Sequence, residues 1–142
     1  VMTDENSYTC LEFKPFLQEF DAQAVLNSVD ENLIELFESC ANGSFADEYE
    51  DILTNDNCSV SCVVKSRTDG QVIPNLELAE SAVSFQGAAK NKYFEYISAK
   101  GNNFVLTSCA KTFSRAKKML AEDLELVKFD GMKYRKDIAE SR

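Results

Sequence analysis

The chain has 142 residues, a formal net charge of −9 and no histidine. The lack of histidine excludes Ser-His-Asp and Cys-His catalytic sites and histidine-based zinc sites, so any acid–base chemistry falls to carboxylates, Lys, Tyr or Cys. The negative charge disfavours nucleic acid and anionic membranes as partners, because their phosphate groups would repel the chain as a whole. At this length we expect one domain, or one small domain joined to a piece of another.

Basic residues nevertheless gather in two places, near the start of the last predicted helix and in the closing segment. They are Lys111, Arg115, Lys117 and Lys118, and then Lys133, Arg135 and Lys136. Cations near a helix N-terminus oppose the helix dipole at a mild cost. We interpret the first group as a solvated face rather than as a functional patch.

The cysteines fit a reducing compartment. They are Cys10, Cys40, Cys58, Cys62 and Cys109. Two residues four apart on a strand lie roughly 13 Å from each other, so Cys58 and Cys62 are too distant for a disulfide. We expect reduced, mostly buried thiols in a cytoplasmic protein. Neither a signal-peptide pattern nor an apolar run of transmembrane length is found, so no membrane partner is expected.

The N-terminal part predicts a turn, a strand and two helices. Residues 4–7 form a turn that looks like the middle of a hairpin, as in a piece of a longer protein. Residues 8–13 follow as a strand. A helical pattern begins at Asp21, and residues 28–31 resemble a capping box for a second helix that ends at Asn42-Gly43. Residues 43–56 are an acidic loop, the best candidate for a boundary.

The remainder predicts four strands and one helix. The strands lie at residues 58–64, 82–87, 93–98 and 104–109, with turns around residues 68–70, 91 and 101–103. Three of these runs lie close together with short connections, which favours an antiparallel meander. Thr112 is the expected N-cap of a helix whose apolar face carries Phe113, Ala116, Met119, Leu120, Leu124 and Val127. A turn at Asp130-Gly131 then lets the closing segment pack back on the core.

The closing segment, residues 129–138, resembles the C-terminal signature of phosphoribosylamine–glycine ligases, F-x-G-x-x-Y-R-x-D-I-G. The matching residues are Phe129, Gly131, Tyr134, Arg135, Asp137 and Ile138, and Ala139 replaces the last glycine. The order of the preceding helices and strands is also similar to the last third of such an enzyme. For Arg135 and Asp137, a salt bridge that fixes this segment is the preferred interpretation over contact with a ligand.

This resemblance implies an α+β fold, in which the end of an ATP-grasp lobe (residues 1–45, a strand plus helix) and an acidic linker (46–56) precede a small C-terminal domain (57–142). That domain would have mostly antiparallel strands with one packed helix. The family joins phosphoribosylamine to glycine in purine biosynthesis, with ATP and Mg²⁺, through a glycyl phosphate. The implied partner is the remainder of the parent enzyme, which would carry the nucleotide-binding regions.

The stretch at residues 11–23, where acids gather between a strand and a helix, is the predicted place for metal or phosphate chemistry. The family's metal-binding motif there reads E-x-N-x-R-F-G-D-P-E-x-Q. Glu12 and Gln23 match its ends, but Lys14 replaces the metal-binding Asn, Phe16 replaces the Arg, and the Gly-Asp-Pro-Glu is missing. An ammonium has no lone pair for Mg²⁺, which prefers oxygen ligands. Glu12 is therefore the candidate metal ligand and Lys14 a candidate phosphate contact.

Three functional hypotheses follow. The first is a C-terminal portion of a divergent ligase that closes one side of the active-site cleft and is inactive alone. The second is a non-catalytic binding or structural module that keeps the fold without the metal site. The third is an unrelated α+β domain, such as a small-molecule binder. Catalytic residues are not assigned by the sequence.

Overall fold

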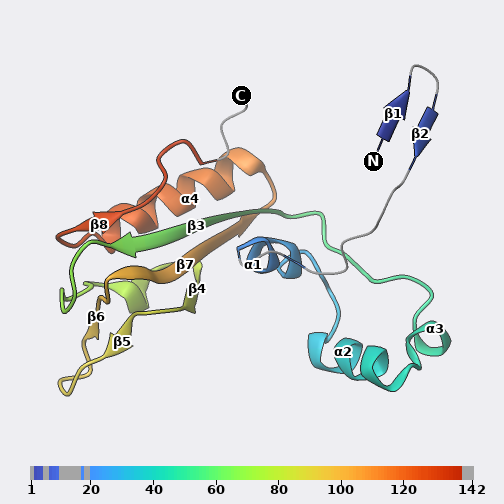
Figure 1. Ribbon diagram of the computed structural model, residues 1–142, viewed down its shortest axis with the longest axis horizontal. Helices are drawn as coiled ribbons and strands as arrows, with labels where there is room; N and C mark the ends of the chain where they lie inside the picture. The colour runs from blue at the N-terminus through green and yellow to red at the C-terminus, as the bar shows by residue number, and fades with distance from the viewer. Residues whose placement is uncertain (1, 5–6, 10–16, 18–19, 139–142) are drawn as a thin grey trace.

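The computed structural model describes residues 2–4, 7–9, 17 and 20–138, and it has the expected α+β fold (Figure 1). The helices are α1 (Asp21–Leu26), α2 (Leu33–Asn42), α3 (Phe45–Glu48) and α4 (Phe113–Leu126), with a 3-10 helix at Leu76–Leu78. The strands are β1 (Met2–Asp4), β2 (Ser7–Thr9), β3 (Cys58–Ser66), β4 (Ala82–Phe85), β5 (Ala89–Lys90), β6 (Tyr96–Ile97), β7 (Gly101–Ala110) and β8 (Met132–Lys133).

The main sheet is antiparallel and has the strand order β4-β7-β3-β8. Its central strand, β7, pairs with β3 along nearly its whole length and with β4 on the other side. Residues 103–108 of β7 are all buried, so both faces of this strand are covered. The apolar runs of β3 and β7, rich in β-branched residues, suit such a buried pair.

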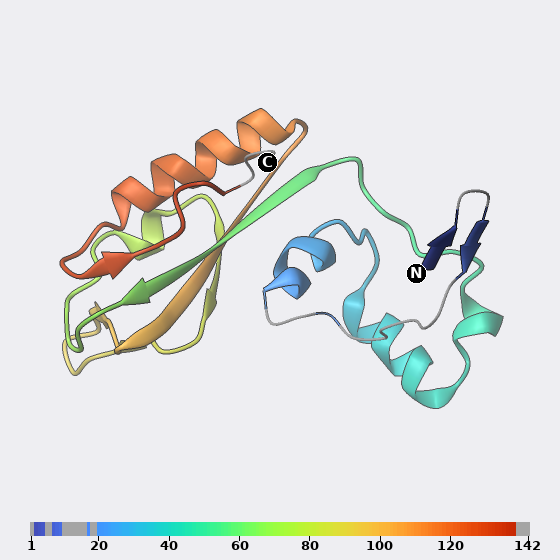
Figure 2. The same cartoon turned by 45° about the horizontal axis from the view of Figure 1, so that its top comes forward.

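Helix α4 packs across one face of this sheet (Figures 1 and 2). Thr112 caps it as predicted, because its hydroxyl accepts a hydrogen bond from the backbone N–H of Arg115 at 3.4 Å. The apolar side chains of the helix join the core beneath β3 and β7: Ala116, Leu120, Leu124 and Val127. Phe113 departs from the prediction. It was expected on this face, but as the first residue of α4 it is 45% exposed.

The predicted meander is wrong at one strand. Residues 93–98 do not enter the main sheet, since β6 pairs with β5 in a separate two-stranded sheet. The predicted turn at residues 101–103 instead begins β7. The cause is Asn103, which is fully buried and saturated with hydrogen bonds. Its carbonyl oxygen accepts from the backbone N–H groups of Gln86, Gly87 and Ala88, and its side chain bonds Ala99 and Gly101.

The second helix begins later than its predicted capping box. Asn32 is the N-cap of α2, where its side chain accepts from the N–H of Ile34 and its amide donates to Glu35. Ser28 instead donates its hydroxyl to the carbonyl of Val25. Gly43 ends the helix at φ 75°, as predicted. The apolar stripe of α2 is largely uncovered by the described residues, with Ile34 78% exposed and Phe37 half exposed.

The predicted strand at residues 8–13 is described only at its first two residues, in β2, and residues 10–13 lie outside the described residues. Strands β1 and β2 pair with Asp4 opposite Ser7, which is the expected hairpin. The acidic loop contains one short helix, α3. Among the described residues, no helix combines the length and the apolar character that crossing a membrane requires.

Candidate functional site

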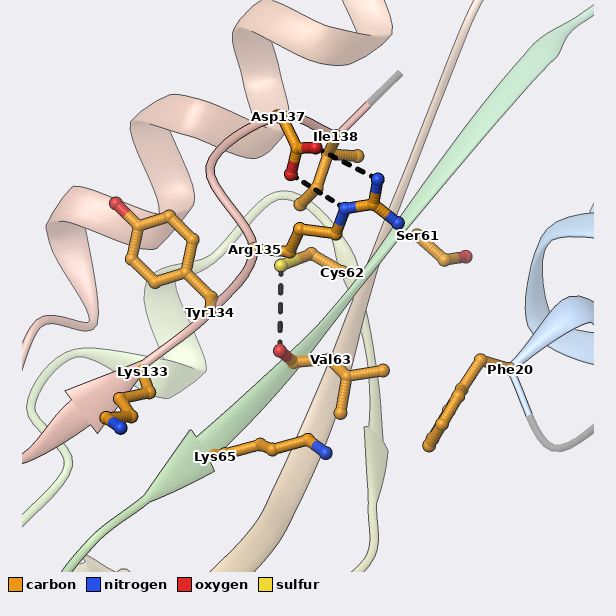
Figure 3. A pocket seen from close by; sticks show the side chains of 10 residues that line it. All are labelled: Phe20, Ser61, Cys62, Val63, Lys65, Lys133, Tyr134, Arg135, Asp137 and Ile138. Atoms are coloured by element: carbon orange, nitrogen blue, oxygen red, sulfur yellow. Dashed lines mark hydrogen bonds and ion pairs between the residues drawn. The ribbon is translucent and has the colours of Figure 1, made fainter. Parts of the chain in front are cut away.

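A cavity of about 540 Å³ opens beside β3, next to the part of this strand that β8 leaves unpaired (Figure 3). One wall is β3, a second is the closing segment after β8, and the third is Phe20, which directly precedes α1. The described lining residues are Phe20, Ser61, Cys62, Val63, Lys65, Lys133, Tyr134, Arg135, Asp137 and Ile138. The volume lies in the range typical of small-molecule sites.

The cavity exists because β8 is short. β8 pairs with β3 only at Lys65 and Ser66, after which the chain leaves the sheet. Gly131, directly before β8, makes the turn that brings the chain to β3. It adopts φ 77°, a conformation that residues with a side chain rarely take. Its carbonyl accepts from the N–H of Arg67 at 3.1 Å, and an added Cβ would lie 2.9 Å from the Thr68 hydroxyl. The glycine of the closing signature therefore has a structural cause.

Lys65 and Lys133 are directly opposite one another in the β3–β8 register. Like charges at such positions repel, which costs stability. Both side chains are exposed, and neither forms an ion pair within the described part of the chain. The ladder between β3 and β7 also shifts register between Val64 and Lys65. Bulges of this kind are common where a side chain is redirected beside a site.

Arg135 and Asp137 form the expected salt bridge, and it is bidentate. Arg135 Nε donates to Asp137 Oδ1 at 2.7 Å, and Nη2 donates to Oδ2 at 2.9 Å. The hydrogen bonds from Arg135 hold the pKa of the Asp137 carboxyl below its ordinary value. The pair stiffens the closing segment, and it also presents the guanidinium to the cavity.

The thiol of Cys62 is an inert part of the wall. Burial raises its pKa to about 11, so it stays protonated at neutral pH and is a poor nucleophile. The four described cysteines are free, as expected, but the expectation that they are mostly buried is wrong. Of these four, Cys62 is buried, Cys58 and Cys109 are partly covered, and Cys40 is exposed on α2, whose outer face no described element covers.

The two residues predicted from the family motif, Glu12 and Lys14, lie outside the described residues, as does Phe16. The chain becomes described again at Phe20, whose ring forms a wall of the cavity. Gln23 is in α1 and lines a different, smaller cavity.

The described cavity does not suit Mg²⁺. Its charged groups are three cations and one carboxylate, and that carboxylate is already bound by Arg135. Mg²⁺ prefers several oxygen ligands in octahedral geometry. No group of three or more potential metal ligands from Cys, Asp and Glu occurs among the described residues. The donor set therefore favours an anion over a metal ion.

The sequence predicted some of the charged residues of this site but not all of them. Lys133 and Arg135 were recognised as a basic group, but Lys65 and Phe20 were missed. A signal for Lys65 was available, because it is the one charged residue in the strand Cys58–Ser66. Phe20 carried no signal, since its place depends on how α1 packs against β3.

Comparison with known proteins gives one informative similarity. No family model matches the chain. The chain is 26% identical, over 148 aligned residues, to the trifunctional purine biosynthetic protein adenosine-3 of Chironomus tentans. The alignment covers 97% of this chain, which spans 11% of the length of that protein. Along nearly all of its sequence, the chain is thus similar to a segment of a purine biosynthetic protein.

Proposed function

We propose that the chain is the C-terminal portion of a divergent phosphoribosylamine–glycine ligase, and that it closes one side of the active-site cleft without being active alone. The observation that carries this proposal is the similarity to a purine biosynthetic protein across 97% of the chain. The similarity alone points to purine biosynthesis in general, and the closing signature at residues 129–138 favours this particular ligase. ATP and Mg²⁺ then belong to the complete enzyme, of which this chain supplies one wall.

The places of the signature residues support this assignment. Phe129 lies in the core, and Gly131 makes the turn that returns the chain to β3. Tyr134 and Ile138 pack against the core and line the cavity, while Arg135 and Asp137 fix the segment between them. The signature thus builds one wall of the cavity that Phe20 also lines.

The partner in this proposal is the remainder of the parent enzyme, in the cytoplasm. The apolar stripe of α2 supports such a partner, because Ile34 and Phe37 would otherwise stay in water. We retain the division into residues 1–45, 46–56 and 57–142. The linker is attached to the first part, since the N–H of Asp30 donates to Leu53 and that of Asn55 donates to Ser28, both at 2.8 Å.

Thermal unfolding with added Mg-ATP tests the proposal. The melting temperature of the full-length polypeptide, meaning the complete parent enzyme, should rise at millimolar Mg-ATP, because a ligand that binds the native state stabilises it. Glu12→Ala should remove most of this gain, whereas Glu38→Ala, an exposed acid on α2, should leave it intact. The 142-residue chain alone should show no gain. Consumption of ATP that requires both glycine and phosphoribosylamine then identifies the reaction.

A non-catalytic module is the second candidate. It is favoured by Lys14, Phe16 and the missing Gly-Asp-Pro-Glu, which remove most of the metal-binding motif. If the full-length polypeptide shows no shift with Mg-ATP and consumes no ATP, this candidate replaces the first.

A further inference from the structure

We propose that the β5–β6 hairpin docks onto the acidic linker (residues 46–56) of a second copy of this chain, with Phe94 as its anchor. The inference goes beyond the ligase assignment, since it uses neither the cavity beside β3 nor the α2 stripe that the proposed function gives to the parent enzyme. Three observations carry it: an exposed aromatic residue in a strained turn, the rigidity of that turn, and a linker of complementary charge.

Phe94 stands where neither burial nor local conformation favours a phenylalanine. Its side chain is 82% exposed, and its backbone adopts φ 64°. This left-handed conformation is costly for a bulky residue, whereas Gly and Asn adopt it readily. The other positive-φ residue besides glycine in the described chain is Asn75, which suits the conformation. The strain at Phe94 is not offset by packing within one copy, and a surface that covers its ring would offset it.

The turn that presents Phe94 is rigid. The side-chain oxygen of Asn91 accepts from the backbone N–H groups of Tyr93 at 2.8 Å and Glu95 at 3.1 Å. Its amide donates to the Glu95 carboxylate at 2.9 Å, and the N–H of Phe94 donates to the Asn91 carbonyl at 3.0 Å. An aromatic side chain on such a preorganised loop loses little conformational entropy on binding, which is typical of an interface hot spot.

The hairpin tip is also basic. Lys90 lies over the ring of Tyr96 and Lys92 over that of Tyr93, each with its Nζ 4.9 Å from the ring centroid. Neither lysine forms an ion pair within the described part of the chain. Tyr93 is 68% exposed, so it adds to the aromatic surface of Phe94. Two exposed rings beside two cations fit an apolar surface that is bordered by acids.

The acidic linker provides such a surface. Its charged residues are all acids, namely Asp47, Glu48, Glu50, Asp51 and Asp56. Ile52 and Leu53 stand among them, 42% and 62% exposed. They are held in place, because the carbonyl of Leu53 accepts from the N–H of Asp30 at 2.8 Å and Thr54 pairs with Val29 in a β-bridge. Two acids precede this apolar pair, just as two lysines precede the aromatic pair.

The two surfaces do not meet within one molecule. Figures 1 and 2 both show β5 and β6 at one end of the molecule, and α3 with the residues that follow it at the other. The contact therefore needs a second copy. A reciprocal arrangement, in which the tip of each copy contacts the linker of the other, closes as a two-fold symmetric dimer. Each tip is small, so we expect a dimer of the weak, readily dissociating class.

Sedimentation velocity of the 142-residue chain over a range of concentrations provides the test. The wild type should pass from monomer to dimer as the concentration rises. Phe94→Gly should weaken dimerisation by about tenfold or more without lowering the melting temperature, because Gly adopts φ 64° without strain. The matched control is Leu78→Ala, which shortens another exposed apolar side chain, 64% exposed, and should dimerise as the wild type does.

Charge-reversed variants identify the two surfaces. K90E/K92E and E50K/D51K should each be monomeric, because like charges then face each other in both contacts. An equimolar mixture of the two variants should form a heterodimer, since every tip then meets a linker of opposite charge. The control K118E reverses a lysine on α4 and should dimerise as the wild type does.

Three results would overturn the proposal: a wild type that stays monomeric at every concentration, a Phe94→Gly variant that dimerises like the wild type, or a mixture of charge-reversed variants that stays monomeric. A dimer that survives in Phe94→Gly but is lost in Phe37→Ser would place the contact on the α2 stripe instead. None of these results bears on the Mg-ATP experiment, which depends on Glu12.

Discussion

The buried carboxylate of Asp123, on α4, accepts hydrogen bonds from the backbone N–H groups of Ser81 at 2.8 Å and Glu80 at 3.1 Å. It thereby joins the helix to the loop that leads into β4, at a distance of more than forty residues along the chain. Only a side chain with two acceptor oxygens satisfies both donors. Asp123 is thus the polar link between the helical layer and the edge of the sheet.

Asp123→Asn should lower the free energy of unfolding by about 1.5–3 kcal/mol, because an amide offers one acceptor oxygen and turns its NH₂ toward the other N–H. Urea unfolding would show this as a lower midpoint with an unchanged slope. Glu122→Gln is the control, since Glu122 is exposed and its ion pair with Lys118 is long, at 3.7 Å. That variant should stay within about 0.5 kcal/mol of the wild type. Equal stability of the two variants would refute the role of Asp123.

Gly87→Ala should be destabilising by about 1–3 kcal/mol, because an added Cβ would collide with the backbone carbonyl oxygen of Asn102. Strand β7 cannot easily shift to make room for this Cβ, because the backbone carbonyl and the side chain of the neighbouring Asn103 are both hydrogen-bonded. Gly70→Asn provides the comparison. Gly70 has φ 74° with nothing within 4 Å of an added Cβ, and Asn tolerates this conformation. The melting temperature should therefore fall for Gly87→Ala and stay nearly unchanged for Gly70→Asn.

The fold was predicted best where one stretch of sequence decides the outcome. The strands at residues 58–64 and 104–109 and the helix from Thr112 follow from apolar runs, periodicity and a cap. The pairing of residues 93–98 was not predictable from local sequence. It depends on the buried Asn103, which forms hydrogen bonds with residues 86–88 and 99 near the start of β7. The site shows the same division. Lys133 and Arg135 are adjacent in sequence, whereas Lys65 joins them only through the β3–β8 register.

Raising the pH should destabilise the protein through Cys62. Its pKa is about 11 in the native state and 9.0 in the unfolded chain, so the native state binds more protons between these values. The stability that the protonated thiol contributes is complete below pH 9 and is lost as the pH rises toward 11, at no more than about 1.4 kcal/mol per pH unit. The difference in unfolding free energy between wild type and Cys62→Ala should shrink across this window.

Alkylation gives an independent measurement of the same thiol. At pH 8, Cys40 should react with iodoacetamide far faster than Cys62, because Cys40 is exposed and Cys62 is buried with a raised pKa. Peptide mass spectrometry resolves the two sites. Comparable rates at Cys40 and Cys62 would contradict the packing of the closing segment on β3.

Lowering the pH should weaken the attachment of the closing segment. Asp137 has a native pKa below its ordinary value of 3.8, so its pairing with Arg135 stabilises the native state above that value and is lost as the pH falls through the native pKa. Asp137→Asn should therefore melt slightly below the wild type at pH 6, and the two melting temperatures should converge in acid. The effect is small, because the pair is exposed. A difference that persists unchanged at pH 2 would argue against the ion pair as its cause.

The short length of β8 has a consequence for self-association. Residues 58–64 of β3 have β7 on one side and no described strand on the other, so their outward backbone groups could template another chain. Among the described residues, the closing segment covers this side, and it is docked by Phe129, Tyr134 and Ile138. Substitutions that loosen the segment should therefore appear first as aggregation, while the sheet and α4 still retain their secondary structure. The packing of the closing segment on the core thus also covers backbone groups of β3 that could pair with another chain.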